Sequence, residues 1–220
     1  MPLEADEKIE ALKHYFGITY EEELVVRGIE VRRHEIPNFI KQFQTQLLYT
    51  LFDCKDSSEV ISKGYEDALL LVTQAIDKIM TGEGLAVEDI VISELLRQDI
   101  VKYKSLFPHV SAAIQLSNDT GKHPMKGDTI QYIYTNSQHN NPLCRVVPIA
   151  TGNAQATSLS QYDKEKYKEM ILDAAETVLG FLGSDRAVYS SNIKKKKGTR
   201  KWYDELREEQ TRDIRTETME

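Results

Sequence analysis

Cysteine is scarce in the sequence, and long apolar runs are missing. The 220 residues contain two cysteines, Cys54 and Cys144, and neither belongs to a Cys-x-x-Cys pair. This composition excludes a disulfide-rich domain and indicates reduced thiols in a cytoplasmic protein. No stretch of about 18 apolar residues is present, so we expect no membrane span. The first residues are acidic and lack the apolar segment of a signal peptide.

Clustered metal ligands are missing as well. The five histidines form neither a His-Glu-x-x-His motif nor a Cys/His finger, which argues against a zinc site. Asp53 and Asp56 stand in a predicted loop, and no further carboxylates are grouped with them in a metal-binding motif. We therefore expect no catalytic residue, no cofactor and no metal ion on this chain.

A surplus of positive charge is the third absence. The chain has 28 lysines and arginines against 35 acidic residues, which gives a net charge of −7. A free-standing DNA-binding protein usually carries a basic surplus, because neutralisation of phosphates supplies most of its non-specific affinity. Any contact of this chain with DNA is therefore local, or a partner supplies the remaining basic surface.

A pair of strands is predicted between Lys13 and Arg33. Apolar, largely β-branched residues at 24–31 follow a short acidic turn, which is typical of a hairpin. Alternation with a period of two puts Lys13, Tyr15 and Gly17 on one face of the first strand. Such a strand presents an ammonium group and a phenol side by side. The alternative is an ordinary amphipathic hairpin whose Lys13 and Tyr15 face water.

Three amphipathic helices are predicted by apolar residues at three- and four-residue steps, over residues 36–52, 60–80 and 170–182. The first helix opens around Pro37, which is tolerated in the first turn. The second ends at Gly82, a residue type suited to the position after a helix. The first two helices form a helical hairpin, and most of their apolar residues are expected in a core.

The middle of the chain mixes both kinds of pattern. Residues 87–93 read as a short extended segment, 108–116 as a helix, and 130–132 as a strand after a turn at 126–128. Residues 136–160 are polar and fit a long loop around one short strand. Together these patterns predict an α+β fold that is mostly helical and begins with a short β-hairpin.

Two sets of motifs make the chain similar to the family B DNA polymerases, mainly the archaeal type. The first set resembles the end of the palm domain: Lys13-x-Tyr15, then Arg27-Gly28-Ile29-Glu30 and the pair Arg32-Arg33. The second set resembles the thumb domain, in the same order: Ser93-Glu94-Leu95-Leu96-Arg97, Tyr103-Lys104, Pro108-His109-Val110, Gly127-Asp128-x-Ile130-x-Tyr132 and Tyr162-Asp163-x-x-x-Tyr167. The resemblance covers roughly residues 11–183.

The resemblance implies which residues meet DNA. In the family, the Lys and Tyr of the first motif face the minor groove of the primer–template duplex, where hydrogen-bond acceptors occur on every base pair. Arginines of both motif sets are implied to contact the DNA backbone or to bind the partner chain. The candidate DNA-binding residues are Lys13, Tyr15, Arg27, Arg32, Arg33, Ser93, Arg97, Tyr103 and Lys104.

Two residues of the second motif set, Glu94 and His109, are not counted among the implied DNA contacts. Glu94 stands where the family carries a cation, which leaves the phosphate contact at that position open. His109 is expected to make a local cap or core hydrogen bond rather than to act in catalysis.

The chemistry of nucleotidyl transfer is not encoded in this sequence. That reaction needs two metal ions held by carboxylates, and the sequence has no Asp-Thr-Asp motif, no nucleotide-binding fingers and no exonuclease carboxylates. The resemblance therefore implies the small subunit of a split family B DNA-directed DNA polymerase. In this hypothesis the chain serves DNA replication, a large catalytic subunit binds Mg²⁺, and the isolated chain is inactive.

The resemblance and the charge pattern together predict three parts: a lead-in with palm-edge strands at 1–33, a thumb domain at 34–183, and a charged, flexible tail at 184–220. The tail has a basic cluster that either binds DNA or an acidic partner, or only solubilises the chain. The tail lacks the motif by which many polymerases engage a sliding clamp. The sequence therefore does not decide whether the chain binds a clamp. The alternatives are a stand-alone duplex-binding module, a helical interaction protein, and a fragment of a longer polymerase.

Overall fold

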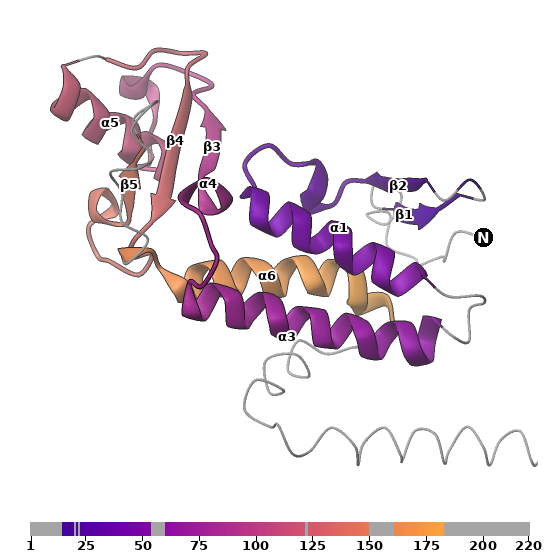
Figure 1. The fold of residues 1–220 in the computed structure, drawn as a ribbon. Helices are drawn as coiled ribbons and strands as arrows, with labels where there is room; N and C mark the ends of the chain where they lie inside the picture. Colours follow the sequence, from indigo (N-terminus) through magenta and orange to yellow (C-terminus); the bar gives the residue numbers. More distant parts are fainter. Residues whose placement is uncertain are drawn as a thin grey trace, which may run out of the picture.

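The computed structural model describes residues 15–19, 21, 23–53, 60–121, 123–149 and 161–182. Lys13 and the predicted tail lie outside these residues. The fold is α+β, as the sequence predicts (Figure 1). Three long helices run side by side, a two-stranded hairpin lies along one of them, and a small sheet with its own helix stands at one end of the bundle.

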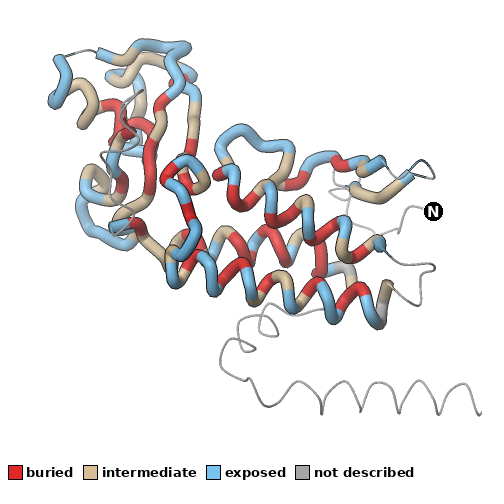
Figure 2. Tube along the Cα trace, in the orientation of Figure 1, coloured by how far each residue is buried: buried red, intermediate tan, exposed pale blue. Residues whose placement is uncertain are grey.

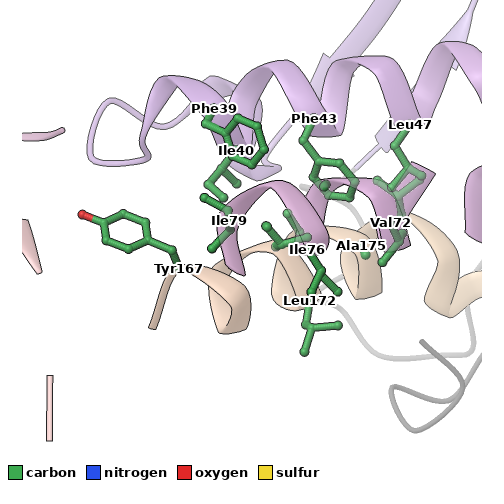
Figure 3. Packing of buried hydrophobic residues seen from close by; sticks show 14 of the residues in the cluster. Phe39, Ile40, Phe43, Leu47, Val72, Ile76, Ile79, Tyr167, Leu172 and Ala175 are labelled. Atoms are coloured by element: carbon green, nitrogen blue, oxygen red, sulfur yellow. The ribbon is translucent and has the colours of Figure 1, made fainter. Parts of the chain in front are cut away.

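The bundle consists of α1 (Asn38–Phe52), α3 (Tyr65–Thr81) and α6 (Lys164–Leu179). Each helix turns its apolar stripe inward, and the buried residues face one another between the helices (Figure 2). Burial of each large apolar side chain stabilises the fold by about 1.5–3 kcal/mol. The residues labelled in Figure 3 come from all three helices and belong to one buried cluster: Phe39, Ile40, Phe43, Leu47, Val72, Ile76, Ile79, Tyr167, Leu172 and Ala175.

The helix ends follow from single residues. Pro37 precedes α1 in an extended conformation, with φ −57° and ψ 148°, so the helix begins at Asn38, two residues later than predicted. Gly82 ends α3 in the left-handed region at φ 78°, as its position in the sequence predicts. A π-helical turn, Val60–Gly64, leads into α3. Asp163 caps α6, because its side chain accepts a hydrogen bond from the Lys166 backbone N–H.

The hairpin is shorter than the sequence predicts. Strand β1 (Tyr15–Ile18) pairs antiparallel with β2 (Leu24–Arg27), and Tyr15 lies opposite Arg27. The prediction that the second strand continues to Arg33 is wrong. Gly28 adopts φ 76°, which turns the chain away from the strand, and a 3₁₀ turn follows at Glu30–Arg32.

The lobe at the end of the bundle contains a three-stranded antiparallel sheet in the order β3-β4-β5. Its strands are β3 (Ile92–Leu95), β4 (Thr129–Tyr134) and β5 (Val146–Pro148), and α5 (Pro108–Thr120) packs on them. A second core fills the space between helix and sheet: Ile92, Leu96, Ala112, Ala113, Ile130, Tyr132 and Val146. Short 3₁₀ turns lie at Ile100–Lys102, Pro142–Cys144 and Gly180–Leu182.

The junction between bundle and lobe differs from the extended segment predicted at 87–93. Residues Val87–Ile90 form one helical turn, α4, because the Asp89 carboxylate accepts the Ala86 backbone N–H at 3.0 Å. The fully buried Tyr167 of α6 ties the two parts together. Its hydroxyl donates to the Ile90 carbonyl at 2.8 Å and accepts the Tyr134 backbone N–H at 3.2 Å. No helix in the described part is long and apolar enough to cross a membrane.

Candidate nucleic-acid interface

The first group of predicted contact residues lies at the hairpin. Tyr15 and Arg27 are cross-strand partners at its open end, and both side chains are exposed, Tyr15 by 46%. Lys13 falls outside the described residues, so its position beside Tyr15 stays a prediction. The phenol and the guanidinium thus lie on neighbouring strands, within reach of one ligand.

Arg32 and Arg33 follow on the 3₁₀ turn, and both are exposed. The Arg32 Nε donates to the Val26 carbonyl at 3.3 Å, which holds this side chain back over the end of β2. Within the described ranges neither arginine forms a salt bridge, whereas three lysines, Lys102, Lys166 and Lys168, pair with carboxylates. An exposed guanidinium that forms no ion pair with a described carboxylate is available for a phosphate.

A buried amide anchors the turn that carries these arginines. Gln44 of α1 is fully buried, and its Oε1 accepts the Val31 backbone N–H at 2.8 Å. Its Nε2 donates to the Glu30 carboxylate at 2.6 Å and to the Ala174 carbonyl at 3.0 Å. The other oxygen of Glu30 accepts the Thr177 hydroxyl at 3.2 Å. The turn is therefore fixed to both α1 and α6.

Sequence analysis missed this anchor, although a signal was present. Gln44 interrupts the apolar stripe of its helix, four residues after Ile40 and three before Leu47. A buried polar side chain is stable only when its hydrogen bonds are satisfied, so a glutamine on a core face indicates a polar partner nearby. The structure identifies that partner as Glu30.

The second group of predicted residues lies on the lobe. Ser93 stands in β3, and its Oγ accepts a hydrogen bond from the Gln131 side-chain amide at 3.3 Å. Beyond the outer end of β3, the Tyr103 hydroxyl accepts the Arg97 backbone N–H at 3.0 Å. Arg97 and Lys104 are exposed. This contact places the two cations on one surface loop, some distance along the lobe from the hairpin group.

Glu94, which stands where the family motif carries a cation, contacts two side chains inside the lobe. Its Oε1 lies 2.8 Å from Nδ1 of the buried His109, and its Oε2 accepts the Tyr132 hydroxyl at 3.1 Å. Burial of this carboxyl acts to raise its pKa, but His109, the Tyr132 hydroxyl and the charge of Arg97 together hold the pKa of Glu94 below its ordinary value. Burial raises the pKa of Tyr132, so this phenol stays a donor. Glu94 is thus an internal partner of His109.

Ser93 of the lobe group lies at the corner between bundle and lobe, close to the segment that follows Arg33. A cleft of about 240 Å³ lies there. His34, directly after Arg33, lines its bundle side, and Ser93 lines its lobe side. The remaining lining residues come from both sides: Ile36, Asn38, Lys41, Glu88, Val91, Gln131 and Ile149. The structure therefore brings Ser93 close to the segment that carries the arginine pair, whereas Arg97, Tyr103 and Lys104 lie farther out.

The described residues offer no donor set for a resident metal ion. No group of three histidine, cysteine, aspartate or glutamate side chains in this part of the chain is arranged to bind one. The residues described here do not fit the two-metal chemistry of nucleotidyl transfer.

Comparison with known proteins identifies the family. A family model described as DNA polymerase family B matches residues 9–185, and the chain belongs to this family. The resemblance inferred from the motifs is thereby confirmed. The DNA polymerase of Archaeoglobus fulgidus is 32% identical over 118 residues, which is 51% of this chain and 14% of that protein. DNA polymerase 1 of Saccharolobus solfataricus is 23% identical over 172 residues, which is 78% of this chain and 18% of that protein.

A solved structure supports the fold. The family B DNA polymerase from the hyperthermophilic archaeon Pyrobaculum calidifontis matches with a TM-score of 0.60 and 19% identity, over 79% of this chain and 21% of that chain. The chain thus spans between 14% and 21% of the length of these three relatives.

Proposed function

We propose that this chain is the duplex-holding part of a family B DNA-directed DNA polymerase and works as the small subunit of a split enzyme in DNA replication. The observation that carries the proposal is the corner cleft, where the segment after Arg33 faces Ser93. The cleft adjoins the segment that carries the exposed Arg32 and Arg33, and exposed cations that form no ion pair with a described carboxylate are suited to a polyanion.

The parts of the chain take separate roles in this proposal. Residues 1–33 complete the edge of a palm domain, residues 34–183 form the thumb, and residues 184–220 form a tail. Lys13 and Tyr15 contact the minor groove, where their hydrogen bonds are tolerant of sequence but sensitive to correct pairing. Arg27, Arg32, Arg33, Arg97 and Lys104 neutralise backbone phosphates or dock on the partner.

The chemical step belongs to the large catalytic subunit. That subunit supplies the carboxylates and the Mg²⁺ ions that clamp the attacking hydroxyl and the triphosphate. This chain contributes affinity and position, because a duplex held in register keeps the primer end at the reacting centre. The proposed complex is cytoplasmic.

Binding of a labelled primer–template duplex tests the role of the arginine pair. The double variant Arg32→Ala and Arg33→Ala removes two phosphate contacts, so the slope of log K against log salt should become shallower by about 1.8. Lys166→Ala and Lys168→Ala together remove the same charge from paired positions on α6 and serve as the control. An equal effect of both double variants would contradict the proposed interface.

A further inference from the structure

Three aromatic rings meet where the segment after β3 enters α5. The rings of Phe107 and His109 lie nearly parallel, with 6° between their planes and 6.0 Å between their centroids. The ring of Tyr103 stands edge-on to both, with its centroid 6.3 Å from that of Phe107 and 5.4 Å from that of His109. Offset and edge-to-face arrangements are the favourable geometries for aromatic side chains. The three rings therefore form one packed group, which we call the Phe107 platform.

The two inner rings of the platform are held in place by polar contacts. His109 is buried, and its Nδ1 lies 2.8 Å from Oε1 of Glu94. Tyr103 is half-buried, and its hydroxyl accepts the Arg97 backbone N–H at 3.0 Å. Phe107 is the outermost ring and is 51% exposed. An exposed ring that is already packed against fixed neighbours loses little conformational freedom when it binds a ligand.

Positive charge lies on the same segment as the platform. Arg97 and Lys104 are exposed, and neither forms an ion pair with a described carboxylate. The carboxylates of this segment have partners of their own: Asp99 pairs with Lys102 at 2.6 Å, and Glu94 contacts side chains inside the lobe. An exposed aromatic ring beside exposed cations is the combination by which proteins bind single-stranded nucleic acids.

We propose that the Phe107 platform binds an unpaired nucleotide of a single-stranded nucleic acid. The base stacks on the exposed ring of Phe107, and Arg97 and Lys104 contact the phosphates beside it. The inference rests on the proposed function and goes beyond it, because bases inside a duplex are stacked on one another and offer no free face to a side chain. Every base has such a face, so binding at the platform is tolerant of sequence. The site therefore fits the single-stranded part of a primer–template.

The affinity of the full chain for a labelled oligo-deoxythymidylate strand, measured at several salt concentrations, tests the site. Phe107→Ala should weaken binding by about tenfold and leave the salt slope unchanged, because it removes a stacking surface and no charge. Phe107→Trp keeps an aromatic face and should bind as tightly as the wild type. Leu106→Ala removes an exposed apolar neighbour that has no ring, and it serves as the matched control. Lys104→Gln should make the salt slope shallower by about 0.7, the loss of one phosphate contact.

The outcomes separate the platform from the wider proposal. Equal weakening by Phe107→Ala and Leu106→Ala, or no weakening by Phe107→Ala, would overturn the stacking site. If Phe107→Ala leaves strand binding unchanged but lowers the recovery of a larger partner chain on co-purification, the platform is a protein-docking surface instead. Wild-type binding of a blunt duplex with a clear salt slope would keep the proposed function in each of these cases. If the wild-type chain binds neither the strand nor the duplex, the platform and the proposed function both fail. Unfolding midpoints of the variants confirm that each is folded.

Discussion

At the scale of single residues, the anchor at Gln44 decides where the arginine pair stands. Its amide satisfies the Val31 backbone N–H, the Glu30 carboxylate and the Ala174 carbonyl in a fully buried position. An alanine at this position would leave all three groups without their partner. Loss of a partner inside a core costs about 1–3 kcal/mol per stranded group, and more for a charged one.

Gln44→Ala should therefore lower the free energy of unfolding by about 3 kcal/mol. Gln42→Ala on the exposed face of the same helix is the matched control and should change it by less than about 0.5 kcal/mol. Urea unfolding of the two variants measures the difference. Equal stabilities would mean that the anchor contributes nothing to holding the turn.

The carboxylate of Glu94 gives a prediction about pH. Its pKa in the folded chain lies below the ordinary value of 4.5, so the folded state favours the ionised form. The stabilisation is then fully present above pH 4.5 and is lost as the pH falls through the folded pKa. The expected result is that Glu94→Gln destabilises the chain at pH 7 and that this loss of stability shrinks as the pH falls below 4.5. If the free energies of unfolding of the variant and the wild type differ by the same amount across this pH range, ionisation of Glu94 does not contribute to the stability of the fold.

At the scale of elements, two glycines mark one boundary that the sequence predicts correctly, the end of α3, and one that it does not, the end of β2. Gly82 was expected to end a helix, and it does so at φ 78°. Gly28 also lies at positive φ, yet the run of β-branched residues around it favoured one continuous strand. The strand ends at Arg27 because Gly28 turns the chain, and beyond it the Val31 N–H bonds to Gln44 instead of a neighbouring strand. Such a partner from α1 is invisible to local pattern reading.

Gly82 and Gly84 form a matched pair for testing the helix end. Both have positive φ, so alanine at either position is strained by about 1–2 kcal/mol. A Cβ at Gly82 would also lie 3.3 Å from the hydroxyl oxygen of Tyr162, whereas one at Gly84 would meet nothing within 4 Å. That hydroxyl donates to the Ile79 carbonyl. Thermal unfolding should show a larger loss for Gly82→Ala than for Gly84→Ala, and equal losses would contradict the close contact.

At the scale of the whole molecule, the bundle, the lobe and the hairpin are predictable, but their assembly is not. Helical periodicity located the three long helices, and strand patterns located parts of both sheets. The corner that joins them depends on long-range contacts, such as Tyr167 with Ile90 and Tyr134. No short stretch of sequence encodes these contacts. The motifs named Ser93 and Arg33 separately, and only the fold brings their segments to one cleft.

The proposed split between duplex holding and chemistry also belongs to the scale of the whole molecule. The sequence has no Asp-Thr-Asp motif, and the chain spans at most 21% of the relatives described above. We expect the pure chain to incorporate no nucleotide on a primer–template with Mg²⁺, because the proposal assigns the carboxylates of the reaction to a partner chain. Incorporation by the highly purified chain would contradict the assignment of catalysis to a partner.

Co-purification of the chain from its source cells, followed by primer extension on the recovered material, tests the central claim most directly. The proposal predicts a larger partner chain with polymerase activity that is lost when this chain is removed and restored when it is added back. If the activity persists without this chain, or if no partner is recovered and the chain alone binds duplex DNA, the split-polymerase account is contradicted.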